Sequence, residues 1–367
     1  MNESVSKPIE SVPELPADMT GLLLDWYDAH RRFLPWREDP TPYHVWVSEI
    51  MLQQTRVDTV IPYYERFMKE LPDVRTLAEV PEERLLKLWE GLGYYSRVRN
   101  MQKAAIQIMQ DHNGVIPSDP ARLEKLSGIG AYTAAAIASI AYQVRIPSVD
   151  GNLLRVYARL AAYREDIRTA AAKKLAENAF LSVLPKDRPG DMNQALMDIG
   201  ATICLPNGAP LCNDCPFAGF CETKKKGLQD EIPKAREKSE KLVDHKTVFL
   251  ILADDLVLLH RRDRKGLLAG LYEFPNTEGT LKKEEAVRYC SSFGFDVSDI
   301  KPAGPARHVF SHRIWEMTGY EVRILNSIPP VLPEGYLFVP IRTLIDEIAI
   351  PAAFFAYSRL IIPVLSE

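Results

Sequence analysis

Two carboxylates are candidates for acid–base chemistry. Glu49 stands between Trp46 and Leu52 in a stretch with helical apolar spacing, so it lies near the buried side of a helix. Burial raises the pKa of a carboxyl group, which suits a general acid. Asp150 stands directly before a second expected helix, where a capping carboxylate accepts backbone N–H bonds and keeps a low pKa. A protonated Glu beside an ionised Asp would let one group donate a proton while the other stabilises positive charge.

Each carboxylate also has a structural explanation. Glu49 could lie at the edge of the buried side of its helix and pair with Arg56, and Asp150 could be an ordinary helix cap. Their positions in the sequence do not show whether they meet in space, so the sequence alone leaves both roles open.

Four of the five cysteines form a second candidate site. Cys204, Cys212, Cys215 and Cys221 fall within eighteen residues, which in a cytosolic chain indicates metal ligation more than disulfides. The spacing is neither a paired CxxC ribbon nor a ferredoxin pattern, so zinc and a [4Fe–4S] cluster both remain open. Cys290 is isolated and fits a packed thiol.

A glycine pattern and two aromatic loops indicate contact with nucleic acid. Gly128 and Gly130 precede a helical run, and the amides at its start, including that of Thr133, point at any anion placed there, such as a DNA phosphate. The loops LPWR at 34–37 and GLGYYSR at 91–97 place aromatics beside arginine, a combination that stacks on or wedges between bases. An ordinary helix connection and core aromatics explain the same patterns.

These residues must be positioned by a long helical part of the chain. Apolar residues recur at helical spacing from Thr20 to about Lys226, with clear runs at 22–26, 46–61, 85–89, 101–109, 133–141, 153–160 and 195–203. A charged segment follows, and then two β-rich runs, 247–253 and 256–261, flank a turn at Asp254 and Asp255. We therefore expect a flexible leader at 1–19, a helical region at 20–226, a linker at 227–246 and a mixed α/β domain at 247–367.

Composition narrows the class of protein. With 367 residues, 46% hydrophobic and 26% charged, the chain is typical of a multidomain globular protein. The net charge of −4 argues against nucleic-acid binding by a global positive field, so any DNA contact must be local. The first residues lack the apolar segment of a secretory signal, and we expect a cytoplasmic protein.

Taken in order, the motifs resemble those of the adenine DNA glycosylases of the MutY family, in the helix-hairpin-helix superfamily that also contains endonuclease III. The similarity runs through LPWR, WVSEIMLQQTRV, WEGLGYYSRVRN, LSGIGAYTAAAI, VDGN and the four cysteines. It implies two all-α domains with a [4Fe–4S] cluster on Cys204, Cys212, Cys215 and Cys221, followed by an α/β Nudix-like domain. The stretch between Cys204 and Cys212 is one residue longer than usual in the family, and we expect the loop to absorb it.

The resemblance also implies roles for individual residues. Glu49 would protonate departing adenine at N7, and Asp150 would stabilise the oxocarbenium-like sugar or bond to it, as in retaining glycosidases. Tyr132 and Asn152 would support that chemistry. The pocket for the flipped adenine would be lined by Arg32, Leu34, Trp36, Arg37, Leu52 and Gln194. Residues that fill or wedge the duplex would be Gln54, Leu92 and Tyr94, and the DNA backbone would lie on Gly128, Gly130 and Thr133.

Two further positions refine the expected activity. Tyr132 stands where lyase members of the superfamily carry a Schiff-base lysine, which favours hydrolysis without strand cleavage. Phe310, Ser311 and His312 match the loop that recognises 8-oxoguanine, whereas residues 286–294 lack the glutamates that hold Mg²⁺ in a working Nudix hydrolase. We therefore expect a monomer that acts on double-stranded DNA containing 8-oxoguanine:A or G:A. The rival hypotheses are a bifunctional pyrimidine glycosylase/lyase and a catalytically silent lesion sensor or redox protein.

Overall fold

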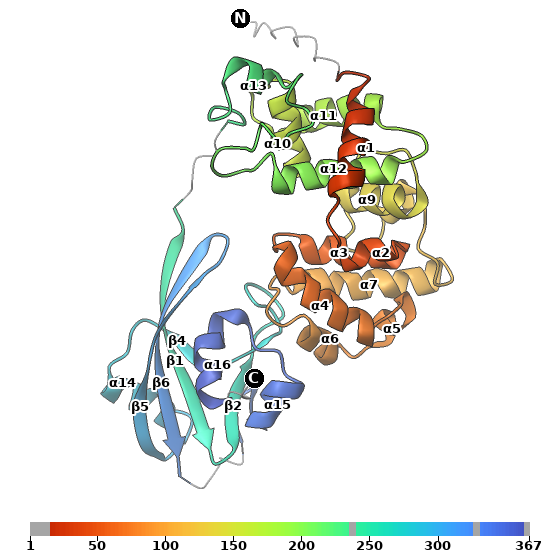
Figure 1. The fold of residues 1–367 in the computed structure, drawn as a ribbon. Coiled ribbons are helices and arrows are strands. Elements are labelled where there is room, and N and C mark those ends of the chain that lie inside the picture. The colour runs from red at the N-terminus through yellow and green to blue at the C-terminus, as the bar shows by residue number, and fades with distance from the viewer. Residues whose placement is uncertain (1–14, 235–239, 326–330, 363–367) are drawn as a thin grey trace, which may run out of the picture. The chain divides into compact units, whose positions relative to one another are not determined.

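The computed structural model describes residues 15–234, 240–325 and 331–362, which form two compact units. The first unit consists of Met1–Ala78 and Asn100–Glu237, and the second of Glu79–Arg99 and Lys238–Glu367. The described part of the first unit is helical, and that of the second combines a sheet with helices (Figure 1). No helix among these residues is long and apolar enough to cross a membrane.

The helices of the first part of the chain mostly follow the expected runs. They are α1 (Met19–His30), α2 (Pro35–Glu38), α3 (Pro42–Leu52), α4 (Val57–Glu70), α5 (Val74–Glu79), α6 (Glu82–Leu88), α7 (Ser96–Asp111), α8 (Pro120–Leu123), α9 (Ala131–Tyr142), α10 (Gly151–Leu160), α11 (Ala170–Val183), α12 (Pro189–Thr202) and α13 (Glu222–Lys226). Leu15 and Met19 are already buried, so the packed structure begins slightly before residue 20, and residues 1–14 of the expected leader lie outside the described residues.

The expected run at 46–61 is wrong as a single helix, because two helices occupy it. Thr41 caps α3 by accepting a hydrogen bond from the His44 amide, and α3 ends at Leu52. Gln54 has φ +58°, a left-handed conformation that ends a helix. Glu49 therefore lies in the last turn of α3, close to a bend in the chain.

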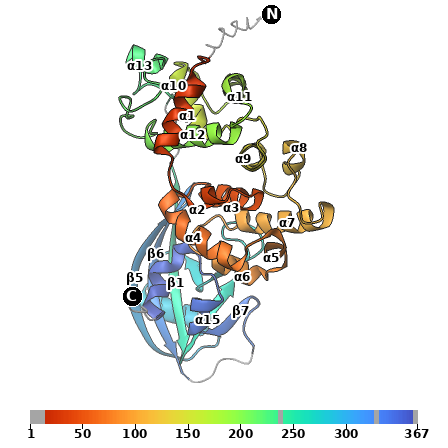
Figure 2. The same cartoon turned by 45° about the vertical axis from the view of Figure 1, so that its right-hand side comes forward.

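Two groups of helices build the interior of the first unit. Helices α1, α10, α11 and α12 share one core around Tyr157 and Phe180, and they gather together in Figure 2. Helix α9 is buried along most of its length, as an apolar helix should be, and it packs on both α3 and α12. The backbones of α12 and α9 come very close at Gly190, where an added Cβ would stand 2.7 Å from the Ser139 carbonyl oxygen. This contact fixes α12 against the helix that carries Tyr132.

The second unit is built on a mixed sheet. Its described strands are β1 (Leu242–Ala253), β2 (Leu256–Arg261), β3 (Tyr272–Glu273), β4 (Asn276–Glu278), β5 (Val297–Val309), β6 (Arg313–Ile324) and β7 (Tyr336–Pro340). Their order is β3-β2-β1-β6-β5, with β4 also on β1 and β7 also on β2, and β1 runs parallel to β6. The expected strand at 256–261 is confirmed, and the expected strand at 247–253 begins earlier, at Leu242.

Helices cover both faces of this sheet (Figure 1). Val248 and Leu250 face α15 (Ile341–Asp346), the 3₁₀ turn Ala352–Phe354 and α16 (Phe355–Ile361). Phe249 faces α14 (Lys283–Ser291), where Cys290 is fully buried, so the prediction of a packed thiol is confirmed. Burial on both faces explains why β1 has a continuous apolar run.

The segment Glu79–Arg99 belongs to the second unit, although we expected it within the helical region. Lys87 in α6 donates hydrogen bonds to the Leu344 carbonyl at 2.7 Å and the Ile348 carbonyl at 3.3 Å. Glu90 accepts one from the Ile350 amide at 2.6 Å, and Arg99 donates to the Ala269 carbonyl at 2.7 Å. These bonds satisfy backbone groups at the ends of elements, which apolar spacing cannot predict.

Candidate active site and cysteine site

Glu49 is a buried carboxyl group at the end of α3. The residue is 7% exposed, and its pKa is raised from 4.5 to about 7. Burial is the largest cause and the charge of Asp150 also raises the pKa, whereas a hydrogen bond from Tyr132 and the charge of Arg37 lower it. The raised pKa predicted from the sequence is confirmed, and the group is half protonated near neutral pH.

Asp150 caps α10 as the sequence predicts. Its Oδ1 accepts hydrogen bonds from the Asn152 and Leu153 amides, both at 2.9 Å, and its Oδ2 accepts one from Asn152 Nδ2 at 2.9 Å. Burial nevertheless raises its pKa, and the three bonds only oppose that effect. The expectation of a lowered pKa is therefore wrong, because the cost of desolvating the carboxylate outweighs the hydrogen bonds that it accepts.

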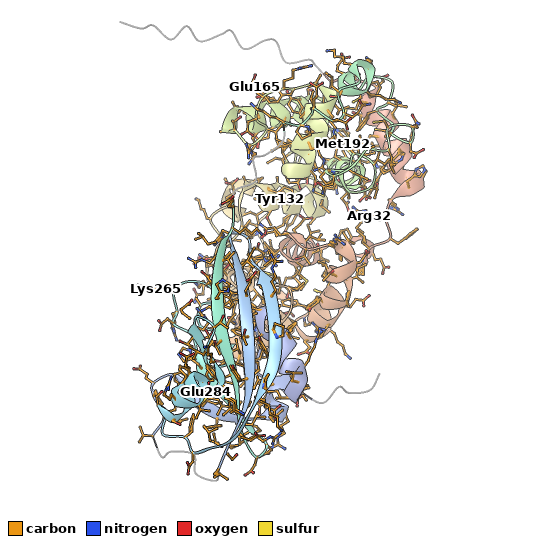
Figure 3. All side chains as sticks on the ribbon, turned by 90° about the vertical axis from the view of Figure 1, so that its left-hand side faces the viewer. Arg32, Tyr132, Glu165, Met192, Lys265 and Glu284 are labelled. Carbon is orange, nitrogen blue, oxygen red and sulfur yellow. The ribbon has the colours of Figure 1, made fainter. Side chains whose placement is uncertain are left out.

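Tyr132 lies in the first turn of α9 (Figure 3), against the Glu49 carboxyl group. Burial and the charges of Glu49 and Asp150 raise its pKa well above the ordinary value, so its hydroxyl stays protonated and can donate. The sulfur of Met197 in α12 lies 4.0 Å from the same hydroxyl. Helices α3 and α9 and the N-terminal end of α10 thus bring the predicted catalytic residues within electrostatic reach of one another.

Asn152 links the Asp150 carboxylate to the interior. Its Oδ1 accepts a hydrogen bond from Arg155 at 3.0 Å, and Arg155 also donates to the Gly200 and Cys204 carbonyls at 2.8 and 2.9 Å. Arg155 is 6% exposed. The amide of Asn152 is therefore held in the orientation that donates to Asp150.

A pocket of about 390 Å³ opens beside Glu49. It brings together all of the residues predicted to surround a flipped base, which are Arg32, Leu34, Trp36, Arg37, Leu52 and Gln194. Val45, Ser48, Val57 and Ile140 complete its lining. The pocket is mainly apolar with a few convergent polar groups, as is usual for a small-molecule or base site.

A buried acid that was not predicted from the sequence lies under this pocket. Asp198 in α12 is fully buried and forms ion pairs with Arg37 at 2.8 Å and Arg32 at 2.5 Å. It stands four residues after Gln194, on the same face of the helix, and that spacing was the available signal.

The predicted hairpin has the expected backbone. Gly128 has φ +77°, and an added Cβ would stand 2.7 Å from Asn100 Cβ, so the turn requires glycine. Gly130 caps α9 with open space around it. Thr133 is buried, so only its backbone could face an anion.

The predicted duplex-contacting residues differ in exposure. Gln54 is exposed in the turn after α3. In the second unit, Leu92 is only 6% exposed, whereas Tyr94 is 48% exposed. Of these two, Tyr94 is presented for stacking or insertion and Leu92 is packed inside.

Tyr94 contacts the loop predicted to read the lesion. Its hydroxyl lies 2.6 Å from Ser311 Oγ, and the ring of Phe310 packs edge-on against Trp315. Tyr94, Phe310, Ser311 and His312 share a cavity of about 1090 Å³ in the second unit. The structure therefore groups the wedge candidate with the loop candidate.

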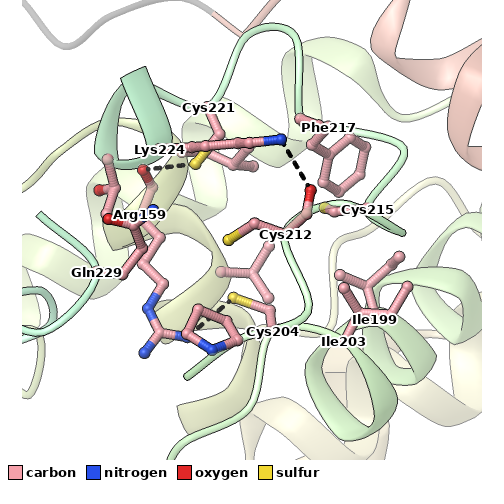
Figure 4. A pocket seen from close by; sticks show the side chains of 15 residues that line it. Arg159, Ile199, Ile203, Cys204, Cys212, Cys215, Phe217, Cys221, Lys224 and Gln229 are labelled. Atoms are coloured by element: carbon pink, nitrogen blue, oxygen red, sulfur yellow. Dashed lines mark hydrogen bonds between the residues drawn. The ribbon is translucent and has the colours of Figure 1, made fainter. Parts of the chain in front are cut away.

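The four clustered cysteines line a recess of about 430 Å³ between α10, α12 and α13 (Figure 4). None of them forms a disulfide. Arg159 donates to Cys204 Sγ at 3.3 Å, and Cys221 Sγ donates to the Arg159 carbonyl at 3.3 Å. Burial, together with the other three sulfurs, raises the pKa of Cys215 to about 12. Four cysteines in this recess would need a neighbouring positive charge to remain ionised.

The four sulfurs surround one recess, but within the described residues no three His, Cys, Asp or Glu side chains are placed to hold one metal ion. Four cysteines are a donor set that both zinc and iron–sulfur clusters use.

Comparisons with known proteins agree with this geometry. A family model for the HhH-GPD superfamily base excision DNA repair proteins matches residues 47–185, and a NUDIX domain model matches 247–358. Adenine DNA glycosylase of Buchnera aphidicola (subsp. Baizongia pistaciae) is 36% identical over 79% of this chain and 82% of its own. This chain belongs to the adenine DNA glycosylase family.

A second relative supports the same family, and a solved structure supports the fold of the helical part. The mouse (Mus musculus) adenine DNA glycosylase is 34% identical over 87% of this chain and 74% of its own. A solved thermostable thymine-DNA glycosylase aligns with a TM-score of 0.51 and 26% identity, over 56% of this chain and 95% of its own. The predicted MutY-family resemblance and the helix-hairpin-helix fold followed by a Nudix-like domain are confirmed.

Proposed function

We propose that this protein is a base excision repair enzyme that hydrolyses the N-glycosidic bond of adenine paired with 8-oxoguanine or guanine in DNA. The observation that carries the proposal is the buried Glu49, whose pKa of about 7 makes it a proton donor beside a pocket lined by Arg32, Trp36 and Gln194. The similar adenine DNA glycosylases support adenine as the excised base.

Glu49 acts on the leaving group. A flipped adenine enters the pocket of Arg32, Trp36 and Gln194, and the Glu49 carboxyl donates its proton to N7. The C1′–N9 bond then breaks and its electron pair leaves with adenine, which departs as the neutral base. Tyr132 donates a hydrogen bond to the resulting Glu49 carboxylate, which stabilises it in a buried site.

Asp150 acts on the sugar. Its carboxylate stabilises the positive charge that develops at C1′ or bonds to that carbon. Asn152 and two backbone amides hold the carboxylate in place. Water then adds to C1′, and its proton returns to the Glu49 carboxylate, which leaves an abasic site and restores the acid.

Hydrolysis rather than strand cleavage follows from Tyr132. A lyase needs an amine that forms a Schiff base, and a phenol cannot supply one. The remaining interactions place the duplex: the hairpin amides around Gly128 and Gly130 bind phosphate, and Tyr94 with Phe310, Ser311 and His312 reads 8-oxoguanine. The Nudix-like domain acts in recognition without nucleotide hydrolysis.

Cys204, Cys212, Cys215 and Cys221 would hold a [4Fe–4S] cluster. Their four sulfurs and the adjoining recess support this assignment. When bound, the cluster supplies the positive charge that keeps four thiolates ionised and cross-links the loop after α12. Arg159 orients this loop through Cys204 Sγ and the Leu205 carbonyl.

A glycosylase assay tests the proposed function. The duplex contains one 8-oxoguanine:A pair, and products are analysed with and without alkali to separate base release from nicking. We expect adenine release with strand breaks only after alkali, and we expect Glu49→Gln to bind the duplex without releasing adenine. Release of thymine glycol with spontaneous nicking, and none of adenine, would support the bifunctional pyrimidine glycosylase instead. No base release by the unmodified protein would favour the lesion sensor.

A further inference from the structure

The strongest feature outside the proposed mechanism is the buried ionic cluster of Asp198, Arg32 and Arg37. Asp198 accepts hydrogen bonds from Arg37 at 2.8 and 3.0 Å and from Arg32 Nε at 2.7 Å. Its side chain is 1% exposed, and those of Arg32 and Arg37 are 28% and 12% exposed. Both arginines line the base pocket, whereas Asp198 lies behind them.

The cluster leaves a net positive charge at the pocket. Two positively charged guanidinium groups share one carboxylate. Arg37 faces Glu49, and so do Tyr132 from α9 and Asp150 from the turn before α10, while Tyr27 from α1 faces Arg37 and Asp198. Removal of the Asp198 charge would therefore double the net positive charge of the cluster, which faces Glu49 through Arg37.

We propose that Asp198 is a positioning residue that holds Arg32 and Arg37 in the base pocket and limits the positive charge that Glu49 experiences. This inference rests on the proposed function, because it concerns the acid that protonates adenine. Without the Asp198 charge, Glu49 would lose its proton at lower pH, and it would be mostly ionised when the base arrives.

Asp198→Asn is the primary test, because it removes the charge with little change of shape. Single-turnover adenine release is measured on the 8-oxoguanine:A duplex at saturating enzyme from pH 5.5 to 8.5. We expect the midpoint of the pH profile to fall by about one pH unit, the size of effect that a nearby charge produces. At pH 8 the rate should fall about tenfold relative to the unmodified protein, with much closer rates at pH 5.5.

Two further variants separate charge from structure. Arg32→Gln combined with Asp198→Asn restores the original net charge of the cluster, so the midpoint should return toward that of the unmodified protein even if the maximal rate stays low. Asp198→Glu keeps the charge and should keep the midpoint. A rate lowered equally at every pH, with the same midpoint in all variants, would overturn the inference.

A direct measurement of the Glu49 protonation state tests this inference separately from the proposed function. Infrared difference spectra against Glu49→Gln report the protonated carboxyl group without any turnover. A lower Glu49 pKa in Asp198→Asn would support the inference even if the unmodified protein released no adenine, which would defeat the proposed function alone. An unchanged Glu49 pKa alongside normal adenine release would defeat the inference alone. If Asp198→Asn does not fold, the pH profiles of Asp198→Glu and Arg32→Gln provide the test. The inference is supported if Asp198→Glu keeps the midpoint of the unmodified protein and Arg32→Gln has a higher midpoint. It is overturned if the midpoint of Arg32→Gln does not shift.

Discussion

Replacement of Glu49 by glutamine should stabilise the protein at alkaline pH. The pKa of Glu49 rises from 4.5 in the unfolded chain to about 7 in the fold because the group is buried. Between these two values the folded state binds more protons than the unfolded state, so stability falls as pH rises. Above pH 7 the full difference, about 3 kcal/mol, counts against the folded state. Glutamine has no charge to bury, and it escapes this cost.

Chemical unfolding at pH 5 and pH 8, followed through the helical signal, measures the effect. Glu49→Gln should be close to the unmodified protein at pH 5 and more stable by about 3 kcal/mol at pH 8. Glu65→Gln on the exposed side of α4 is the matched control and should change little at either pH. A Glu49→Gln gain of the same size at both pH values would refute the reasoning, because the effect would then come from packing rather than ionisation.

Three other changes test the site. Tyr132→Phe removes the hydrogen bond that lowers the Glu49 pKa, so the midpoint of the adenine-release pH profile should move upward while the maximal rate falls; an unchanged midpoint would contradict that contact. Asn152→Ala removes a hydrogen bond to the Asp150 carboxylate, and single-turnover rates should fall about tenfold to a hundredfold with duplex affinity largely kept. Ser311→Ala removes the partner of the Tyr94 hydroxyl and should slow 8-oxoguanine:A more than G:A, with equal losses on both duplexes counting against lesion reading.

The positions of single side chains in a helix could be predicted from the sequence, but the electrostatic surroundings of those side chains could not. The apolar spacing around Glu49 was enough to predict burial and a raised pKa, and the position of Asp150 was enough to predict a cap. The raised pKa of Asp150 was not predictable, because its burial depends on helices distant in the chain. Asp198 was missed for a similar reason, since its arginine partners lie more than 160 residues earlier.

Element boundaries show a related limit. The run at 46–61 has one helical period throughout, and only the left-handed Gln54 divides it. Leu92 matched a wedge position in sequence, yet the fold packs it inside and exposes Tyr94 instead. Both differences depend on backbone conformation, to which apolar periodicity is insensitive.

The assignment of Glu79–Arg99 to the second unit has a practical consequence for cutting or exchanging parts of this protein. The chain passes between the units three times, after residues 78, 99 and 237, so no single cleavage separates them. A fragment that ends near residue 237 would retain α6 but lose the Leu344, Ile348 and Ile350 backbone groups that Lys87 and Glu90 bind. A chimera that imports the C-terminal half of a relative should therefore import residues 79–99 with it, or the graft would place two foreign surfaces against each other.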